Sequence, residues 1–77
     1  MRRKAVESSS LDSVGYEAGV LEIRFRGGGV YRYFEVPARV HRDLMAARSK
    51  GRFFNERIRD AYRYQRLSLD RGPNPTD

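Results

Sequence analysis

The spacing of the apolar residues changes at Pro37, and this change constrains the fold more than any other feature of the chain. Before Pro37, Leu21, Ile23 and Phe25 alternate with charged residues, which is the period of a half-buried strand. After it, apolar residues recur every third or fourth position, which is the period of an amphipathic helix. The sequence therefore predicts an α+β fold: a small antiparallel β-meander of three to four strands, the fourth an edge strand near Val6, with a C-terminal helical hairpin packed on one face.

A two-residue turn at Ala18-Gly19 would form the first hairpin of the meander. This turn places Tyr16 opposite Leu21 and Val14 opposite Ile23, so that all four side chains share one face of the sheet. Because the apolar pattern and the turn agree, we expect this register.

The second hairpin is less constrained, because Gly27-Gly28-Gly29 allows more than one loop length. A three-residue loop pairs Phe25 with Tyr31 and Ile23 with Tyr33. A two-residue loop would instead bury an arginine in the middle of the sheet, so we prefer the first. The preferred register leaves three side chains on the outer face of the sheet: Val30, Arg32 and Phe34.

Two amphipathic segments follow Pro37, whose fixed φ angle suits the first position of a helix. In the first, Val40, Leu44 and Ala47 would face the sheet. The sequence Ser49-Lys50-Gly51 interrupts this pattern. A second helix, extending to Arg66, would place five residues in its core stripe: Phe54, Ile58, Ala61, Tyr62 and Gln65.

Positive charge is concentrated in the last third of the chain. Sixteen Lys and Arg residues oppose ten Asp and Glu residues, giving a net charge of +6. Most of this surplus lies after residue 47, and localised positive charge favours a polyanionic partner. On the predicted second helix four arginines fall within about 60° of arc: Arg52, Arg59, Arg63 and Arg66.

This arginine flank predicts a nucleic-acid interface. Arginine donates to phosphate oxygens in a bidentate manner, and Lys50 would add a further phosphate contact. Phe53 and Tyr64, on the opposite flank, would offer rings on which bases stack. The alternatives are a solvated charged face for the arginines and packing against the first helix or the sheet edge for the two rings.

Catalytic and metal chemistry have little support in the sequence. The chain has no cysteine, and its single histidine, His41, has no partner at a metal-ligand spacing. The positive helix end at Ser49-Lys50-Gly51 could hold an anion, but the same residues equally serve to separate two helices. We expect a non-enzymatic, cytoplasmic domain without cofactor or metal, with no membrane-spanning segment and no secretory signal.

Several short motifs, taken in order, resemble the KTSC domain family. They comprise Ser8-Ser9, Val14-Gly15-Tyr16, Leu21 to Phe25, Gly29 to Tyr33, Val36-Pro37, Ala47 to Asn55 and Ile58-Arg59. The best-marked positions are Tyr31, Tyr33, Pro37, Ser49, Gly51, Phe54 and Asn55, to which we assign structural roles. The resemblance implies a short domain found alone in small bacterial proteins and at the C-terminus of some lysyl-tRNA synthetases. It implies association with RNA, such as tRNA or another structured RNA, and it brings no catalytic residue.

The predicted organisation is a basic N-terminal arm at 1–5, a single domain at 6–67 and a disordered tail at 68–77. The leading hypothesis for the function is an RNA-binding or RNA-associated module. The alternative is a protein-interaction module that docks through the outer sheet face, where Val30 and Phe34 flank Arg32.

Overall fold

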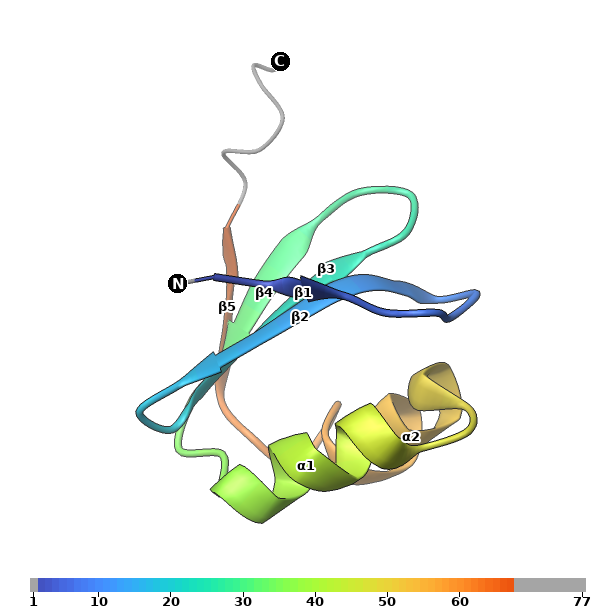
Figure 1. The fold of residues 1–77 in the computed structure, drawn as a ribbon. Helices are drawn as coiled ribbons and strands as arrows, with labels where there is room; N and C mark the ends of the chain where they lie inside the picture. The colour runs from blue at the N-terminus through green and yellow to red at the C-terminus, as the bar shows by residue number, and fades with distance from the viewer. Residues whose placement is uncertain (1, 68–77) are drawn as a thin grey trace.

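Five antiparallel strands form one sheet whose spatial order follows the sequence from β1 to β5. The computed structural model describes residues 2–67, so the tail predicted at 68–77 lies outside the described residues. The elements are β1 (Lys4–Ala5), β2 (Leu11–Glu17), β3 (Val20–Phe25), β4 (Val30–Tyr33), α1 (Ala38–Ala46), α2 (Lys50–Arg57) and β5 (Tyr64–Leu67). Figure 1 shows both helices covering the same face of the sheet. The α+β class is confirmed, and β1 lies within the segment predicted as an N-terminal arm.

The first hairpin has the predicted register. Tyr16 pairs with Leu21 and Val14 pairs with Ile23. Ala18 and Gly19 have φ angles of 50° and 84°. Two consecutive positive φ angles are what a type I′ turn requires, and this turn matches the twist of the flanking strands.

The predicted register of the second hairpin is wrong by two residues. Ile23 pairs with Tyr31 and Leu21 pairs with Tyr33, because the hairpin closes one residue earlier than expected, with the Phe25 amide donating to the Gly29 carbonyl oxygen. All three glycines at 27–29 have positive φ angles, which residues with a side chain rarely adopt. Since side chains alternate between faces, a shift of two residues leaves every side chain on its predicted face. Tyr31 and Tyr33 therefore still pack with the core.

The prediction of a second helix that extends to Arg66 is wrong. Helix α2 ends at Arg57, turns follow, and Tyr64–Leu67 forms β5 against β4. The helical pattern competes here with the unpaired edge of β4, whose backbone groups need hydrogen-bond partners. Residues 63–67 supply them, and the Phe34 amide donates to the Arg63 carbonyl oxygen at 2.9 Å. The meander therefore has a fifth strand, and the helical hairpin lies between β4 and β5.

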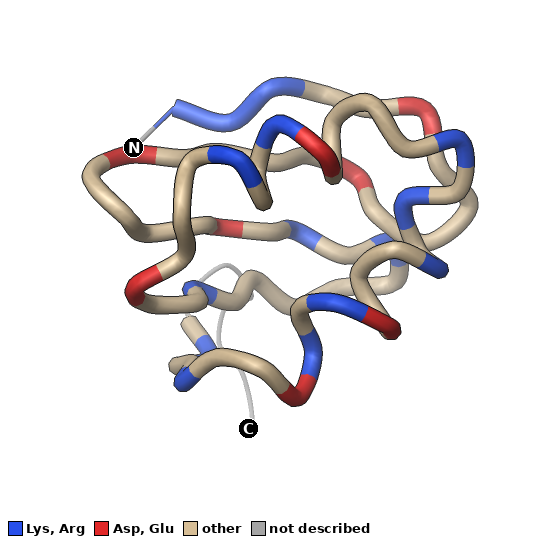
Figure 2. The backbone as a smooth tube through the Cα atoms, turned by 90° about the horizontal axis from the view of Figure 1, so that it is seen from below, with Lys and Arg blue, Asp and Glu red and all other residues tan. Residues whose placement is uncertain are grey.

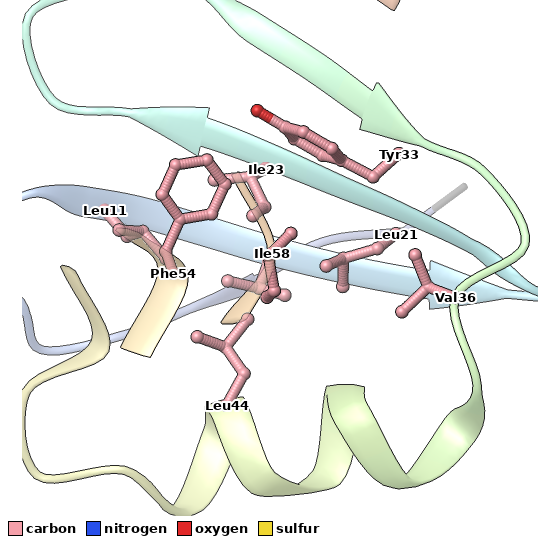
Figure 3. Close-up of a cluster of buried hydrophobic side chains, with 9 residues drawn as sticks. Leu11, Leu21, Ile23, Tyr33, Val36, Leu44, Phe54 and Ile58 are labelled. Atoms are coloured by element: carbon pink, nitrogen blue, oxygen red, sulfur yellow. The ribbon is translucent and has the colours of Figure 1, made fainter. Parts of the chain in front are cut away.

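The core lies between the sheet and the two helices (Figure 3). Leu44 of α1 and Ile58, just after α2, point toward the sheet and are fully buried. Helix α2 also packs closely on the segment before β2: a Cβ atom at Gly51 would lie 2.6 Å from Ser10 Oγ, so a larger residue there would force Ser10 or the helix to shift. The buried core residues are Leu11, Val14, Leu21, Ile23, Tyr33, Val36, Leu44, Phe54 and Ile58.

The outer face of the sheet carries a buried ion-pair cluster. Glu22 alternates with the core residues Leu21 and Ile23, so it points away from the helices, yet it is only 3% exposed. Arg32 Nε donates to its carboxylate at 2.7 Å, and Arg3 donates to the other oxygen. Burial alone would raise the pKa of Glu22, but the hydrogen bonds and positive charges of the two arginines outweigh burial and lower it.

Candidate nucleic-acid interface

An open pocket of about 490 Å³ lies on the helix-bearing face, beside the edge strand β5. This volume falls in the range of small-ligand pockets, about 300–1,000 Å³. The pocket is lined by Phe25, Gly28, Tyr31, Tyr33, Phe54, Arg59, Asp60 and Tyr64. Five of these eight residues are aromatic, so the pocket suits a flat aromatic ligand.

Strand pairing brings three tyrosines together. Tyr31 and Tyr33 are two residues apart on β4 and share a face, and β5 places Tyr64 directly opposite Tyr33. The ring centroid of Tyr64 lies 5.6 Å from that of Tyr33 and 5.8 Å from that of Tyr31. Tyr33 is buried, whereas Tyr64 is 56% exposed and therefore accessible to a ligand.

Two phenylalanines complete the aromatic wall. The ring of Phe54, from α2, meets Phe25 and Tyr33 edge-on at centroid distances of 5.1 and 5.4 Å. Phe25 meets Tyr31 in the same way at 5.5 Å. These edge-to-face contacts hold the rings in fixed orientations. The wall is consequently preorganised and needs little rearrangement to receive a ligand.

One arginine lines the same pocket and a second lies over one of its rings. Arg66 pairs with Tyr31 across the β4–β5 ladder, and its guanidinium carbon lies 5.7 Å from the Tyr31 ring centroid. Arg59 lines the pocket from the turn after α2. Burial, together with the neighbouring Tyr31 and Tyr64, raises the pKa of Tyr33 to about 12, and Arg59 opposes this shift. The Tyr33 hydroxyl is therefore protonated at neutral pH and remains a hydrogen-bond donor.

The structure divides the arginines that were predicted to share one helical flank. Arg59 lines the pocket and Arg66 lies over the ring of Tyr31, one of the lining residues, but Arg63 lies over the ring of Phe34, 5.6 Å from its centroid, beyond the end of β4. Arg52 remains on α2 and pairs with Glu56 at 3.1 Å. The single flank does not form because α2 ends at Arg57. Figure 2 likewise shows Lys and Arg along most of the chain, not gathered on one element.

The other predicted contact residues are also separated. Tyr64 joins the pocket, whereas Phe53 packs against the core and lies under Arg57, at 5.9 Å from ring centroid to guanidinium carbon. Lys50 Nζ donates to the Ala47 carbonyl oxygen at 3.0 Å. Ser49 accepts a hydrogen bond from the Arg52 amide and so caps α2. These contacts fit the interpretation of Ser49-Lys50-Gly51 as the junction between two helices.

The residues of the family motif have distinct positions in the structure. Tyr31, Tyr33 and Phe54 line the pocket, while Pro37 directly precedes α1 and Asn55 is exposed on α2. Sequence reasoning missed Phe25 and Asp60 as pocket residues. Rings and polar residues alternate at Tyr62-Arg63-Tyr64-Gln65, a strand pattern that could have indicated β5, but nothing in the sequence pointed to Asp60.

Within residues 2–67, no group of three or more potential ligands could hold a metal ion. The His41 ring instead stacks on Tyr16 with a centroid distance of 4.8 Å, and burial lowers the pKa of His41. The helices of this part of the chain are too short and too polar to cross a membrane.

These features define a small α+β domain in which an antiparallel sheet is covered by two helices, and in which the sheet, α2 and the turn after α2 line an open aromatic pocket. A model of the KTSC domain matches residues 7–62, and the chain belongs to this family. A crystal structure of a KTSC domain protein from Yersinia pestis has a TM-score of 0.82 and 41% sequence identity, covering 86% of this chain and 96% of that one.

Small uncharacterised proteins and tRNA ligases both contain sequences similar to this chain. An uncharacterised protein of Stutzerimonas stutzeri is 46% identical over 70 residues, covering 87% of this chain and 99% of the relative. A lysine–tRNA ligase of Nostoc punctiforme is 41% identical over 64 residues, covering 80% of this chain but 11% of the ligase. The domain thus occurs both as nearly a whole small protein and as a small part of a tRNA ligase.

Proposed function

We propose that this protein is a non-enzymatic RNA-binding module, and that its aromatic pocket receives an unpaired stretch of RNA. The observation that carries this proposal is the exposed ring of Tyr64 beside Tyr31 and Tyr33, with Arg59 and Arg66 next to the rings. Proteins recognise unpaired RNA by stacking bases on aromatic rings and pairing phosphates with arginine. The pocket and its arginines supply both kinds of contact at one place.

Two further observations, the net charge of the chain and the identity of one relative, support RNA as the partner. A net charge of +6 favours association with a polyanion. The lysine–tRNA ligase relative carries a matching stretch in an enzyme whose name specifies tRNA. We infer that the shared domain contributes an RNA contact in both settings, and that in this chain the contact occurs in the cytoplasm.

The alternative interface on the outer sheet face has less support. Val30, one of its three expected residues, is only 4% exposed, because β5 places Leu67 beside it. Arg32 is engaged by Glu22, and Phe34 is partly covered by Arg63. The continuous exposed apolar strip that would attract a protein partner is therefore missing from this face.

The proposal predicts salt-dependent binding to RNA with an unpaired segment. Fluorescence anisotropy with a labelled tRNA, and with a single strand of about ten nucleotides, measures the affinity from about 50 to 300 mM salt. If two to four phosphates are neutralised, the logarithm of the affinity falls with the logarithm of salt with a slope of roughly −1.5 to −3. Absence of binding to both RNAs at low salt would refute the proposal.

Arg66 and Arg63 provide a matched pair of variants. Arg66→Gln and Arg63→Gln remove the same charge three residues apart, one at the pocket and one at the Phe34 ring. We expect Arg66→Gln to weaken binding several-fold and to reduce the salt slope by about 0.7, with a much smaller effect of Arg63→Gln. Equal effects of the two variants would show attraction by net charge alone.

A further inference from the structure

The pocket contains one acidic side chain, and this residue suggests which base it receives. Asp60 lines the pocket next to Arg59 and is exposed. Among residues 2–67, the ion pairs of the structure do not involve Asp60, so its carboxylate oxygens are available to a ligand. A free carboxylate accepts hydrogen bonds, and an aromatic wall stacks with flat groups. The pocket therefore suits a flat ligand that carries hydrogen-bond donors.

Resting on the proposed RNA-binding function, we propose that the pocket selects guanine, with the base stacked on Tyr64 and its Watson–Crick edge on the Asp60 carboxylate. An ionised carboxylate only accepts hydrogen bonds, and its two oxygens can accept two in parallel. Guanine presents two adjacent donors on that edge, N1–H and the N2 amino group. Adenine and cytosine present one donor next to an acceptor, and uracil presents one donor between two carbonyl oxygens.

The charges around the pocket separate the base from the phosphates. A phosphate inside the pocket would face the negative charge of Asp60, whereas Arg59 and Arg66 offer it a favourable position beside the rings. A neutral base is therefore the part of a nucleotide that enters. A cationic side chain could also use an aromatic pocket with a carboxylate. Arg59 and Arg66 disfavour such a ligand by repulsion, as does the positive net charge of the chain.

The test compares four labelled uridine-rich strands of about ten nucleotides that differ at one central position, which is G, A, C or U. Fluorescence anisotropy at one fixed low salt concentration gives the affinity of each. We expect the strand with G to bind about tenfold more tightly than the others, as a bidentate base contact typically provides. The Asp60→Asn variant, of nearly the same shape, should reduce this preference to about twofold.

The control variant is Asp12→Asn, which removes the same charge from a carboxylate paired with Arg24. It should leave the preference for G unchanged, and thermal melting should show that both variants are folded. Competition by GMP and AMP then tests whether the base is recognised outside RNA, and GMP should displace the strand at lower concentration than AMP.

The outcomes separate this inference from the proposed function. Equal binding of all four strands, still weakened by Arg66→Gln, overturns guanine selection and leaves RNA binding in place. Binding of GMP that depends on Asp60, without binding of any strand, supports the guanine pocket and refutes the RNA-binding function. Binding of a trimethyl-lysine peptide that depends on Asp60, without any preference for G, overturns the inference in favour of a protein ligand.

Discussion

The buried carboxylate of Glu22 should contribute strongly to stability, and Glu22→Gln tests this directly. The side chain of Glu22 is 4% exposed and accepts charge-assisted hydrogen bonds from Arg3 and Arg32. Replacement by Gln keeps the shape but removes the charge, so two guanidinium groups lose their anionic partner.

The expected magnitude follows from the exposure of the three groups. Breaking a fully buried ion pair costs about 3–5 kcal/mol. The side chains of Arg3 and Arg32 are 26% and 41% exposed, so hydration by water replaces part of the interaction that they lose with the Glu22 carboxylate. We therefore expect the free energy of unfolding to fall by about 2 kcal/mol, and the melting temperature by roughly 8–16 °C for a domain of this size.

The control is Asp12→Asn, which removes a carboxylate that is 47% exposed and lies 3.6 Å from Arg24. Because exposed pairs contribute little, we expect a loss below about 0.5 kcal/mol. Urea denaturation followed by circular dichroism measures both losses. If Glu22→Gln costs no more than Asp12→Asn, the cluster does not stabilise the sheet and the reasoning is refuted.

The pH dependence of the same variant gives a second check. The pKa of Glu22 is lowered in the folded protein, so its stabilisation is present above the ordinary carboxyl pKa, about 4.3, and is lost as the pH falls through the folded pKa. The difference in stability between the wild type and Glu22→Gln should therefore shrink below about pH 4. A difference that stays constant from neutral to strongly acidic pH would contradict this account.

Two further predictions concern packing and alkaline pH. Gly51→Ala should lower the free energy of unfolding by about 1–3 kcal/mol in urea denaturation, because its Cβ would lie 2.6 Å from Ser10 Oγ, and Ser10→Gly in the same chain should restore part of the loss. Because the pKa of Tyr33 is raised to about 12, its phenol ionises more readily in the unfolded chain, and stability should fall between about pH 10 and pH 12. Tyr33→Phe should weaken this alkaline loss, and an unchanged pH profile would refute the assignment.

Sequence periodicity predicted the parts of the fold that depend on neighbouring residues. The turn at Ala18-Gly19 has one favourable length. This length and the alternation of apolar residues predict the same register of β2 and β3, which the structure confirms. At Gly27-Gly28-Gly29 the loop length was underdetermined, and the register was displaced by two residues. Each side chain still lies on its predicted face of the sheet, because side chains alternate between faces with a period of two residues.

The end of α2 could not be predicted because it depends on a distant element. Ile58, Ala61 and Tyr62 follow a helical pattern. The residues after position 62 nevertheless form a strand, because they pair with the otherwise unpaired edge of β4. The same error affected the predicted site. Tyr64 and Arg66 come from β5 and Arg59 comes from the turn after α2, so they do not share a helix, and Arg63 lies at the Phe34 ring.

RNA binding at the aromatic pocket can be observed residue by residue when the isotope-labelled protein is titrated with a single-stranded RNA that contains guanine and followed by NMR. We expect saturable, salt-sensitive shifts of the Tyr31, Tyr33 and Tyr64 rings and of the amides around Arg59 and Asp60. Residues of the outer face, such as Glu22 and Phe34, should remain nearly unchanged. An absence of shifts at low salt, or shifts confined to the outer face, would contradict RNA binding at the pocket.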